Sequence, residues 1–369
     1  MNIYTSTQNI LIKIRLIYLY FLFKKKYKRL IKIQDYNNQF LPGETEFLDK
    51  WHQLTKFVEP YSYRFFSRYC GLNPDIIPEY IGDGIIQEKL SPRRYRPFYQ
   101  DKNLYAQYIG KNFIPKTFLC RINKSPILLN DYTVLKESFK DFINNIPQDT
   151  LILKPSIDSN SGKGVQIFKK IVKEGHINWL TPDNNKLLTE EYLYEYGENW
   201  ILQEAIIQHP YIAQFSSSSV NTFRICAYRS SKDNQIKIPA AALRIGKEGC
   251  IIDNACAGGK FVGIDINTGK LGNYVCDKDG NKSSVWNSIN FEEQEFYIPN
   301  WAQILNFAKE VASKNLHCRA LGLDIALKDD GNPVLIEYNV EFYGYWLFMY
   351  TGQNVFGEYL NEIIDYCKR

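Results

Sequence analysis

The stretch GLDIALKDDGNPVLIEYNV, residues 322–340, contains two apolar runs on either side of a polar turn. This pattern predicts an antiparallel hairpin whose strands cover residues 320–327 and 333–339. We expect a register in which Leu327 pairs with Val334. The polar side chains that this register brings together guide the interpretation of the rest of the chain.

Polar side chains interrupt the apolar pattern of the hairpin at three positions. In the expected register, Asp324 lies directly opposite Glu337, and Asn339 lies on the same face as Glu337. Carboxylates in apolar strands are unfavourable to bury without a partner. A cation with oxygen ligands removes that penalty, and Mg2+ at nucleotide sites is bound in this way. We therefore predict a metal site here; the alternative is a solvated strand end with ordinary hydrogen bonds.

A second polar loop lies in residues 151–170, which read LILKPSIDSNSGKGVQIFKK. A Walker-type phosphate loop needs a glycine five residues before its Gly-Lys pair, a Ser or Thr after the pair, and then a helix. Ile157 and Gly164 occupy those two positions, and the run that follows alternates like a strand. The stretch is therefore predicted to be a flap, a strand–loop–strand hairpin with Lys154 at its root.

The remaining sequence predicts a mixture of helices and strands. Helical patterns cover residues 46–57, 61–69, 101–108, 134–144, 190–197 and 301–312, and strand patterns cover residues 113–119, 200–206 and several runs between 221 and 252. The predicted fold class is α+β, with a mostly helical N-terminal region.

Composition and charge restrict the class of protein. Among the 369 residues are eight scattered cysteines without a C-x-x-C pair, and four histidines, which is typical of a reduced cytoplasmic protein without a disulfide framework or zinc site. Residues 1–33 contain eight of the 45 Lys and Arg residues and no acidic residue, which leaves 37 basic against 40 acidic residues elsewhere. The body thus lacks a basic surplus, and we expect no nucleic-acid partner.

The basic start of the chain has two interpretations of equal weight. Residues 10–23 are largely apolar, but the run is too short and too charged to span a bilayer, and it lacks the features of a signal peptide. Residues 1–33 form either a basic amphipathic helix on the inner face of an anionic membrane or a helix packed on the body with a solvated basic end. Under the first interpretation, a chain that starts near residue 37 is expected to fold without them.

The order of these features resembles the ATP-grasp superfamily, in which nucleotide is clamped between two α+β subdomains. Asp101-Lys102 precedes a helix, the flap follows, and the strand Gln203-Glu204-Ala205-Ile206 comes before the final hairpin. The runs IIQHPYIAQFSSSSVNTFRICAY, AALRIGKEGCIIDNACAGG and GLDIALKDDGNPVLIEYNV are similar to the sugar-transfer-associated ATP-grasp family of bacterial cell-surface polysaccharide and capsule clusters. The resemblance covers about residues 95–340.

This resemblance implies ATP and Mg2+ as cofactors. The nucleotide contacts would come from Lys102, Lys154, the loop residues Ser161, Gly162, Lys163 and Gly164, the hinge residues Gln203, Glu204, Ala205 and Ile206, and His209. For His209 a capping or core histidine is the alternative. The metal ligands would be Asp324, Glu337 and Asn339.

The resemblance also implies a substrate side. Arg224 and Arg244, together with Lys154, would be catalytic, although structural ion pairs are the alternative for either arginine. Substrate contacts would come from Asn221, Thr222, Asp253, Asn254, Gly258 and Gly259, where glycine permits close backbone approach. The sequence departs from the family at Leu323, where Trp is common, and after Glu337, where an aromatic run replaces a small one.

The expected division has four parts. Residues 1–33 form the basic helix, 34–95 a helical region, 96–206 the N-terminal ATP-grasp subdomain with the flap, and 207–369 the C-terminal subdomain with the metal site. The implied activity is an ATP-dependent ligase that joins a carboxylate to an amine through an acyl phosphate, with small-molecule or glycan-precursor substrates. The alternatives are an ATP-grasp kinase and an inactive nucleotide-binding scaffold at the membrane. The sequence does not specify the oligomeric state.

Overall fold

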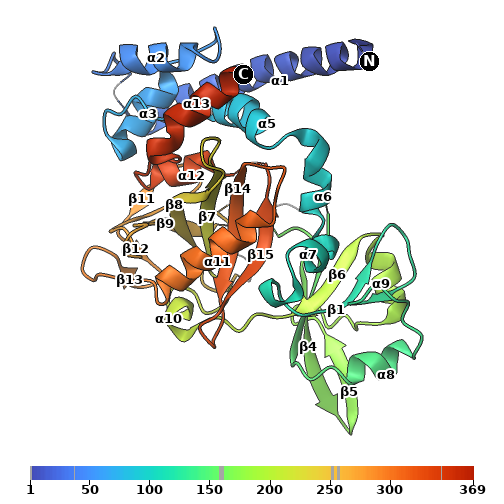
Figure 1. Cartoon of the computed structure of the whole chain (residues 1–369). Coiled ribbons are helices and arrows are strands. Elements are labelled where there is room, and N and C mark those ends of the chain that lie inside the picture. The colour runs from blue at the N-terminus through green and yellow to red at the C-terminus, as the bar shows by residue number, and fades with distance from the viewer. Residues whose placement is uncertain (1, 37, 158–161, 251–252, 256–257, 342) are drawn as a thin grey trace.

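The computed structural model describes residues 2–36, 38–157, 162–250, 253–255, 258–341 and 343–369. Two antiparallel sheets covered by helices form two lobes, and a helical layer that contains both chain ends lies across the second lobe (Figure 1). The predicted α+β class with a helical N-terminal region is confirmed.

The first lobe is built on a six-stranded sheet with the strand order β2-β1-β6-β3-β4-β5. Its strands are β1 (Thr117–Arg121), β2 (Leu128–Leu129), β3 (Thr150–Pro155), β4 (Gln166–Lys173), β5 (His176–Leu180) and β6 (Trp200–Glu204). Helices α8 (Phe139–Asn144) and α9 (Glu190–Tyr196) pack on the face that carries Leu151 and Leu153. Because side chains alternate along a strand, the other face of β3 carries Thr150, Ile152 and Lys154.

One predicted element of this lobe is shorter than expected. The helix predicted for residues 134–144 begins only at Phe139, because Val134 forms a β-bridge with Leu128. The first half of the apolar pattern therefore belongs to the edge of the sheet.

The second lobe is built on a seven-stranded sheet with the order β11-β10-β9-β8-β7-β14-β15. Its strands are β7 (Thr222–Arg229), β8 (Ile236–Ile245), β9 (Lys260–Ile264), β10 (Val275–Cys276), β11 (Lys282–Ser283), β14 (Ala320–Leu327) and β15 (Pro333–Asn339), beside a ribbon of β12 (Val285–Trp286) and β13 (Ile289–Asn290). Helix α11 (Trp301–Ser313) buries its predicted apolar side on one face. Helix α12 (Tyr345–Tyr350) and the helical layer cover the other face.

The hairpin of β14 and β15 has the predicted bounds, and Asp324 lies opposite Glu337 as expected. The register changes by one residue beyond Asp324, so Leu327 pairs with Pro333, and the expected pairing with Val334 is wrong. The extra residue is Ile336, which a bulge leaves out of the ladder. Its side chain lines the cavity between the lobes.

The helical layer consists of α1 (Asn2–Ile33), α2 (Glu44–His52), α3 (Tyr61–Cys70), α4 (Glu79–Ile81), the π-helix η1 (Gly82–Ile86), α5 (Gln87–Leu90) and α13 (Leu360–Lys368). Tyr27, Leu30 and Ile31 of α1 are buried in a core that the layer shares with the second lobe. The packed-helix interpretation of the N-terminus is therefore confirmed for one side of α1. Removal of residues 1–36 would expose this core, which argues against the expectation that the rest folds without them.

Short helices form the segment that connects the helical layer to the first lobe, and another short helix lies between the hinge and the second lobe. They are η2 (Arg93–Tyr95), α6 (Arg96–Gln100), η3 (Lys102–Leu104), α7 (Tyr105–Tyr108), η4 (Lys111–Phe113) and α10 (Pro210–Ala213), while η6 (Gly357–Tyr359) precedes α13. In the described part of the chain, none of the helices combines the length and apolar character needed to cross a bilayer.

Candidate active site

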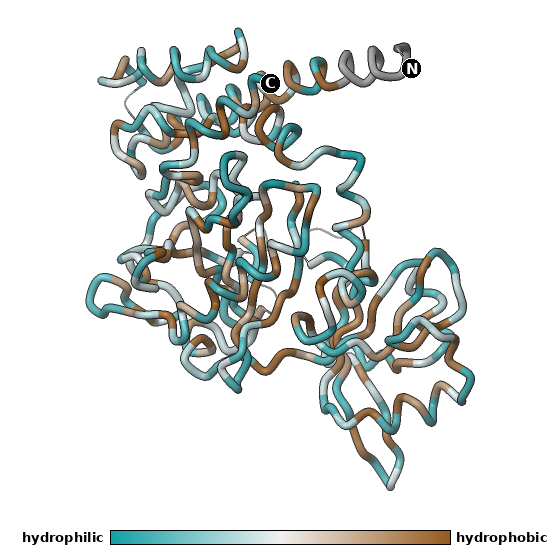
Figure 2. Tube along the Cα trace, viewed as in Figure 1, coloured by the Kyte–Doolittle hydropathy of each residue, from teal (hydrophilic) through white to brown (hydrophobic). Residues whose placement is uncertain are grey.

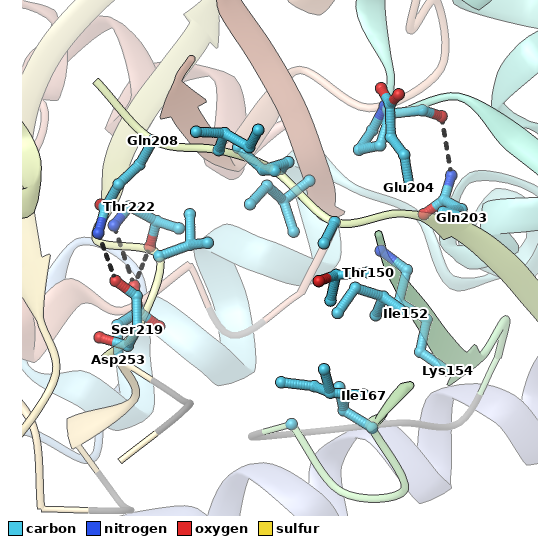
Figure 3. Close-up of a pocket in the computed structure, with 18 of the residues that line it drawn as sticks. Thr150, Ile152, Lys154, Ile167, Gln203, Glu204, Gln208, Ser219, Thr222 and Asp253 are labelled. Atoms are coloured by element: carbon cyan, nitrogen blue, oxygen red, sulfur yellow. Dashed lines mark hydrogen bonds between the residues drawn. The ribbon is translucent and has the colours of Figure 1, made fainter. Parts of the chain in front are cut away.

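A cavity of about 530 Å³ lies between the two lobes, where the chain passes from β6 to β7 (Figure 3). Its lining is mostly apolar, and a few polar groups are gathered on two walls, which is typical of small-molecule sites. The lining residues from the first lobe and hinge include Thr150, Ile152, Lys154, Gly162, Ile167 and Gln203 to Gln208, and those from the second lobe include Ser217 to Ser219, Thr222, Asp253 and Ile336.

The first-lobe wall is the uncovered face of the flap hairpin. Figure 3 shows Thr150, Ile152 and Lys154 following one another along β3, with Ile167 of β4 beside them. Ile152 and Ile167 offer an apolar surface for a flat base, and Lys154 adds a cation at one end. This arrangement suits the base and phosphates of a nucleotide.

Hydrogen bonds of the backbone hold Lys102 beside the root of the flap. Asp101 caps the short helix η3, because its carboxylate accepts a hydrogen bond from Asn103 N at 3.0 Å. Lys102 N donates to Ser156 O at 3.0 Å, directly after β3. The Asp101-Lys102 pair is thereby placed beside the strand that carries Lys154.

The two lysines predicted to contact phosphate are close to each other and to Glu337. Lys102 is buried, and its Nζ lies 2.8 Å from Glu337 Oε1. Burial and then the charge of Lys102 lower the pKa of Lys154 to about 8, while Glu337 acts in the opposite direction. Ammonium groups close enough for one to lower the pKa of the other favour a bound anion such as phosphate.

Asp324 lies at the centre of a buried ion-pair cluster on three neighbouring strands. Arg224 of β7 donates from Nε and Nη2 to the two carboxylate oxygens at 2.6 and 3.0 Å. Arg244 of β8 donates from Nη1 at 3.2 Å. Burial raises the pKa of Asp324, but the two guanidinium groups outweigh burial and hold that pKa below its usual value. Both arginines therefore have at least the structural role that the sequence left open.

The predicted metal ligands are adjacent, but protein cations already balance their charge. Arginines bind Asp324, and Lys102 binds Glu337, so burial of these carboxylates does not require a metal. This corrects the argument from which the metal was predicted. The alternative of a solvated strand end is also wrong for Asp324, which is 4% exposed.

The donor set nevertheless fits Mg2+, which prefers oxygen ligands. Asp324 and Glu337 are paired across the hairpin, and Asn339 Nδ2 lies 3.2 Å from Asp324 Oδ2. The side chain of Glu337 is 29% exposed and therefore accessible. Within the described ranges no cluster of three or more His, Cys, Asp or Glu side chains could hold a metal, so Asn339 would have to complete the set. Metal binding here stays a prediction.

Asp253 connects the ion-pair cluster to the cavity. Its Oδ1 lies 3.0 Å from Arg244 Nη2, and its Oδ2 accepts hydrogen bonds from Thr222 N at 3.1 Å and from Thr222 Oγ1. Burial raises the pKa of Asp253, although Arg244 opposes that effect. Asp253 and Thr222 both line the cavity, and substrate contact by them stays a prediction.

The glycine pair after Asp253 allows the backbone segments to approach closely. A Cβ at Gly259 would lie 2.4 Å from Asp253 O and 2.9 Å from Ile245 O, so no other residue fits without displacement. Gly258 has a φ of 91°, which favours glycine, and Asn254 O accepts from Gly259 N at 3.1 Å. The predicted close approach is thus present, while substrate contact by these residues stays a prediction.

Two residues predicted to bind ligands have structural roles. Asn221 is buried, and its Nδ2 donates to Ile212 O and Ser216 O at 3.0 and 2.9 Å. His209 caps α10, because its Nδ1 accepts from Tyr211 N at 3.2 Å. Neither side chain is among the described residues that line the cavity. The capping alternative for His209 therefore describes its position best.

Gln208 is a site residue that the sequence did not predict. Its Nε2 donates to Ser219 O at 2.7 Å (Figure 3) and to Ser216 O at 3.0 Å, and its Oε1 accepts from Asn221 N at 3.1 Å. These bonds hold the run of four serines, residues 216–219, in place on the second-lobe wall. The one sequence signal for Gln208 was its place two residues after the hinge strand.

The flap lines one side of the cavity. Gly162 lines the cavity and Lys163 is exposed, whereas Ser161 lies outside the described residues. Gly162 and Gly164 have φ values of 73° and 81°, which explains the two glycines. Tyr196 of α9, which was not predicted, donates from its hydroxyl to Gly164 O.

The hinge strand passes along the cavity as expected. Gln203, Glu204, Ala205 and Ile206 all line it. Gln203 Nε2 donates to Pro115 O at 3.1 Å, and the carboxylate of Glu204 accepts from Lys116 N at 2.9 Å. The side chains thus anchor the strand to the segment before β1, and contact with a base would fall to the backbone and to Ala205 and Ile206.

Solved structures resemble this fold only loosely. They include an L-amino acid ligase from Bacillus licheniformis (11% identity, 71% of this chain and 48% of that one, TM-score 0.34). A second is the Staphylococcus aureus N5-carboxyaminoimidazole synthetase with ADP (10% identity, 70% of this chain and 52% of that one, TM-score 0.38). A third is the ATP-grasp ligase PsnB with precursor peptide PsnA2 and AMPPNP (13% identity, 90% of this chain and 77% of that one, TM-score 0.38). The chain thus spans about half the length of the first two proteins.

The family comparison is more extensive. No curated protein has a matching sequence. The profile of the sugar-transfer associated ATP-grasp family matches residues 86–364, which is most of the chain and includes both lobes and the cavity between them. The chain therefore belongs to the sugar-transfer associated ATP-grasp family.

Proposed function

We propose that the protein is an ATP-dependent ligase that activates a carboxylate as an acyl phosphate and transfers it to an amine. The observation that supports this most directly is the meeting of Lys102, Lys154 and Glu337 where a nucleotide-sized cavity approaches the Asp324 cluster. Family membership suggests a substrate used in cell-surface polysaccharide assembly, such as an amino acid joined to a sugar acid.

In this proposal the first-lobe wall binds ATP. The adenine lies between the isoleucines of β3 and β4 and the hinge, and Lys102 and Lys154 bind the phosphates. The flap, from which Gly162 lines the cavity, excludes water around them. Most of the catalytic effect then comes from positioning and from neutralising phosphate charge.

The second-lobe cluster stabilises charge on the substrate side. A carboxylate oxygen attacks the γ-phosphorus, the bond to the β-phosphate oxygen breaks, and ADP leaves. The amine nitrogen then attacks the acyl carbon, the carbon–oxygen bond to phosphate breaks, and the amine proton leaves with the phosphate. Arg224 and Arg244, held in place by Asp324 and Asp253, stabilise the negative charge in both steps. Mg2+ bound by Asp324, Glu337 and Asn339 would supply further charge neutralisation at the phosphates.

The proposal is tested by assaying ADP and phosphate release from ATP with panels of amino acids, sugar acids and amines. A ligase releases phosphate only when both an acid and an amine are present. Transfer of phosphate to a single substrate, with no free phosphate, would identify a kinase and overturn the ligase. No turnover with any pair, together with ATP binding, would favour the scaffold.

Matched variants show whether turnover depends on this site. Lys154→Met is expected to remove nucleotide binding and turnover together. Lys169→Met removes an exposed lysine from the neighbouring strand β4, outside the cavity, and should leave both unchanged.

A further inference from the structure

Helix α1 carries apolar side chains on both of its sides, so it is not the amphipathic helix that the sequence suggested. Leu19, Tyr27, Leu30 and Ile31 are buried against the layer. On the opposite side, five large apolar side chains are 40–63% exposed: Ile14, Ile17, Tyr18, Phe21 and Leu22. Their spacing of three and four residues places them on one face. Figure 2 shows hydrophobic and hydrophilic residues alternating along the described part of this helix.

The same face becomes basic toward its C-terminal end. Lys25, Lys28, Arg29 and Lys32 are exposed and continue the spacing of the apolar group. No acidic residue occurs in residues 1–33, so nothing on the helix itself neutralises these cations. We call the five apolar and four basic side chains together the α1 outer face.

The α1 outer face lies at an edge of the molecule. Figure 1 shows α1 running along the helical layer, with its N-terminal end projecting beyond α13 and the lobes below. The apolar group, from residue 14 to residue 22, spans roughly 12 Å of the helix, and the basic group beyond it about 10 Å. A flat partner can therefore meet both groups at once.

We propose that the α1 outer face docks on the surface of an anionic lipid bilayer. The apolar group enters the boundary between headgroups and acyl chains, and the basic group contacts the anionic headgroups. This surface is independent of the ATP site, because no α1 residue is among the described residues that line the cavity.

Other partners match the face less well. A second copy packed in parallel would oppose four cations with four cations, and an antiparallel copy would place cations on apolar side chains. A nucleic acid would neutralise the basic group but leave five large apolar side chains in water. A bilayer surface satisfies both halves of the face.

The test measures sedimentation of the full-length protein with vesicles of phosphatidylcholine, alone or with one-third phosphatidylglycerol. Binding to the anionic vesicles, weakened as salt rises from about 0.05 to 0.5 M, is expected. Replacing Lys25, Lys28 and Lys32 by Gln should reduce binding about a hundred-fold, at roughly five-fold per cation. The double variant Tyr18→Ser, Phe21→Ser should reduce it at least ten-fold, because it removes the largest exposed rings.

Matched controls change the same residue types in the first lobe, far from α1. Replacing the exposed Lys140, Lys173 and Lys186 by Gln gives the same net charge, and Val172→Ser with Leu187→Ser removes two exposed apolar side chains. These controls should bind vesicles like the wild type. A cooperative thermal melt like that of the wild type confirms that each variant is folded.

Three outcomes would overturn the proposal. The first is no binding to anionic vesicles by the folded wild-type protein. The second is equal loss of binding in the α1 variants and in the controls. The third is a dimer that the Tyr18, Phe21 double variant converts to a monomer, without vesicle binding, because this would assign the face to a second copy.

Discussion

Raising the pH from 7 to 9 is expected to weaken nucleotide binding about ten-fold, because Lys154 loses its charge in this range. The pKa of Lys154 is lowered to about 8, first by burial and then by the neighbouring Lys102. At pH 7 about nine-tenths of the protein carries the ammonium form, and at pH 9 about one-tenth does. If only that form binds phosphate, the apparent Kd rises in proportion to its loss.

The assay is isothermal titration with ADP at pH 7, 8 and 9, in pairs of buffers with different ionisation enthalpies. Bound phosphate raises the pKa of Lys154, so binding above pH 8 is expected to take up nearly one proton per nucleotide. Lys154→Arg keeps its charge throughout this range and should remove both the pH dependence and the proton uptake. A Kd that changes less than two-fold between pH 7 and 9, with no proton uptake, would refute the reasoning.

The nucleotide-free protein should respond in the opposite direction. Because the folded-state pKa of Lys154, about 8, lies below its ordinary value of 10.5, the charged form disfavours folding. This penalty is fully present below pH 8 and disappears as the pH rises from 8 to 10.5. Lys154→Met should therefore raise the melting temperature at pH 7 while abolishing nucleotide binding. Lys169→Met should change neither.

Three further predictions concern the Asp324 cluster, the flap, and Asp83, a buried carboxylic acid of η1. Asp324→Asn should lower the free energy of unfolding in urea by about 3–5 kcal/mol, because it leaves two largely buried arginines without their shared carboxylate. Glu337→Gln should cost less, because the Glu337 side chain is 29% exposed and its amide oxygen would still accept a hydrogen bond from the buried Lys102. Tyr196→Phe should speed hydrogen exchange in the flap at residues 164–166, by releasing Gly164 O, and should change global stability by less than about 1 kcal/mol. Burial and the neighbouring Glu79 raise the pKa of Asp83 to about 8, so wild-type stability should fall as the pH rises toward 8, and Asp83→Asn should flatten this dependence in thermal melts.

Sequence alone determined the local elements and their order. The final hairpin has the predicted bounds, and its opposed carboxylates follow from alternation along two short strands joined by a turn. The flap was separated from a Walker loop by the strand pattern after it, and the same pattern placed Lys154 at the end of a strand, at the root of the flap. These features are local, because each depends on residues within about ten positions of one another.

The tertiary structure decided which charges meet. Arg224 and Asp324 are 100 residues apart in sequence, yet they pair because β7 and β14 are neighbours in the sheet. That neighbour relation gives Asp324 its counter-charge from arginines, where the sequence suggested a metal. The tertiary structure also gives Asn221 and His209, which were predicted to bind ligands, hydrogen bonds within the protein beside the cavity.

The N-terminal helix depends on the tertiary structure in the same way. Its periodic apolar residues predicted a helix, but the pattern could not separate the side that packs on the layer from the side that remains exposed. Burial is a property of what lies opposite a face, and for α1 those partners come from α3, α4 and η1, which are distant in sequence. Local patterns specify which residues can share a face, whereas the arrangement of distant segments specifies what that face contacts.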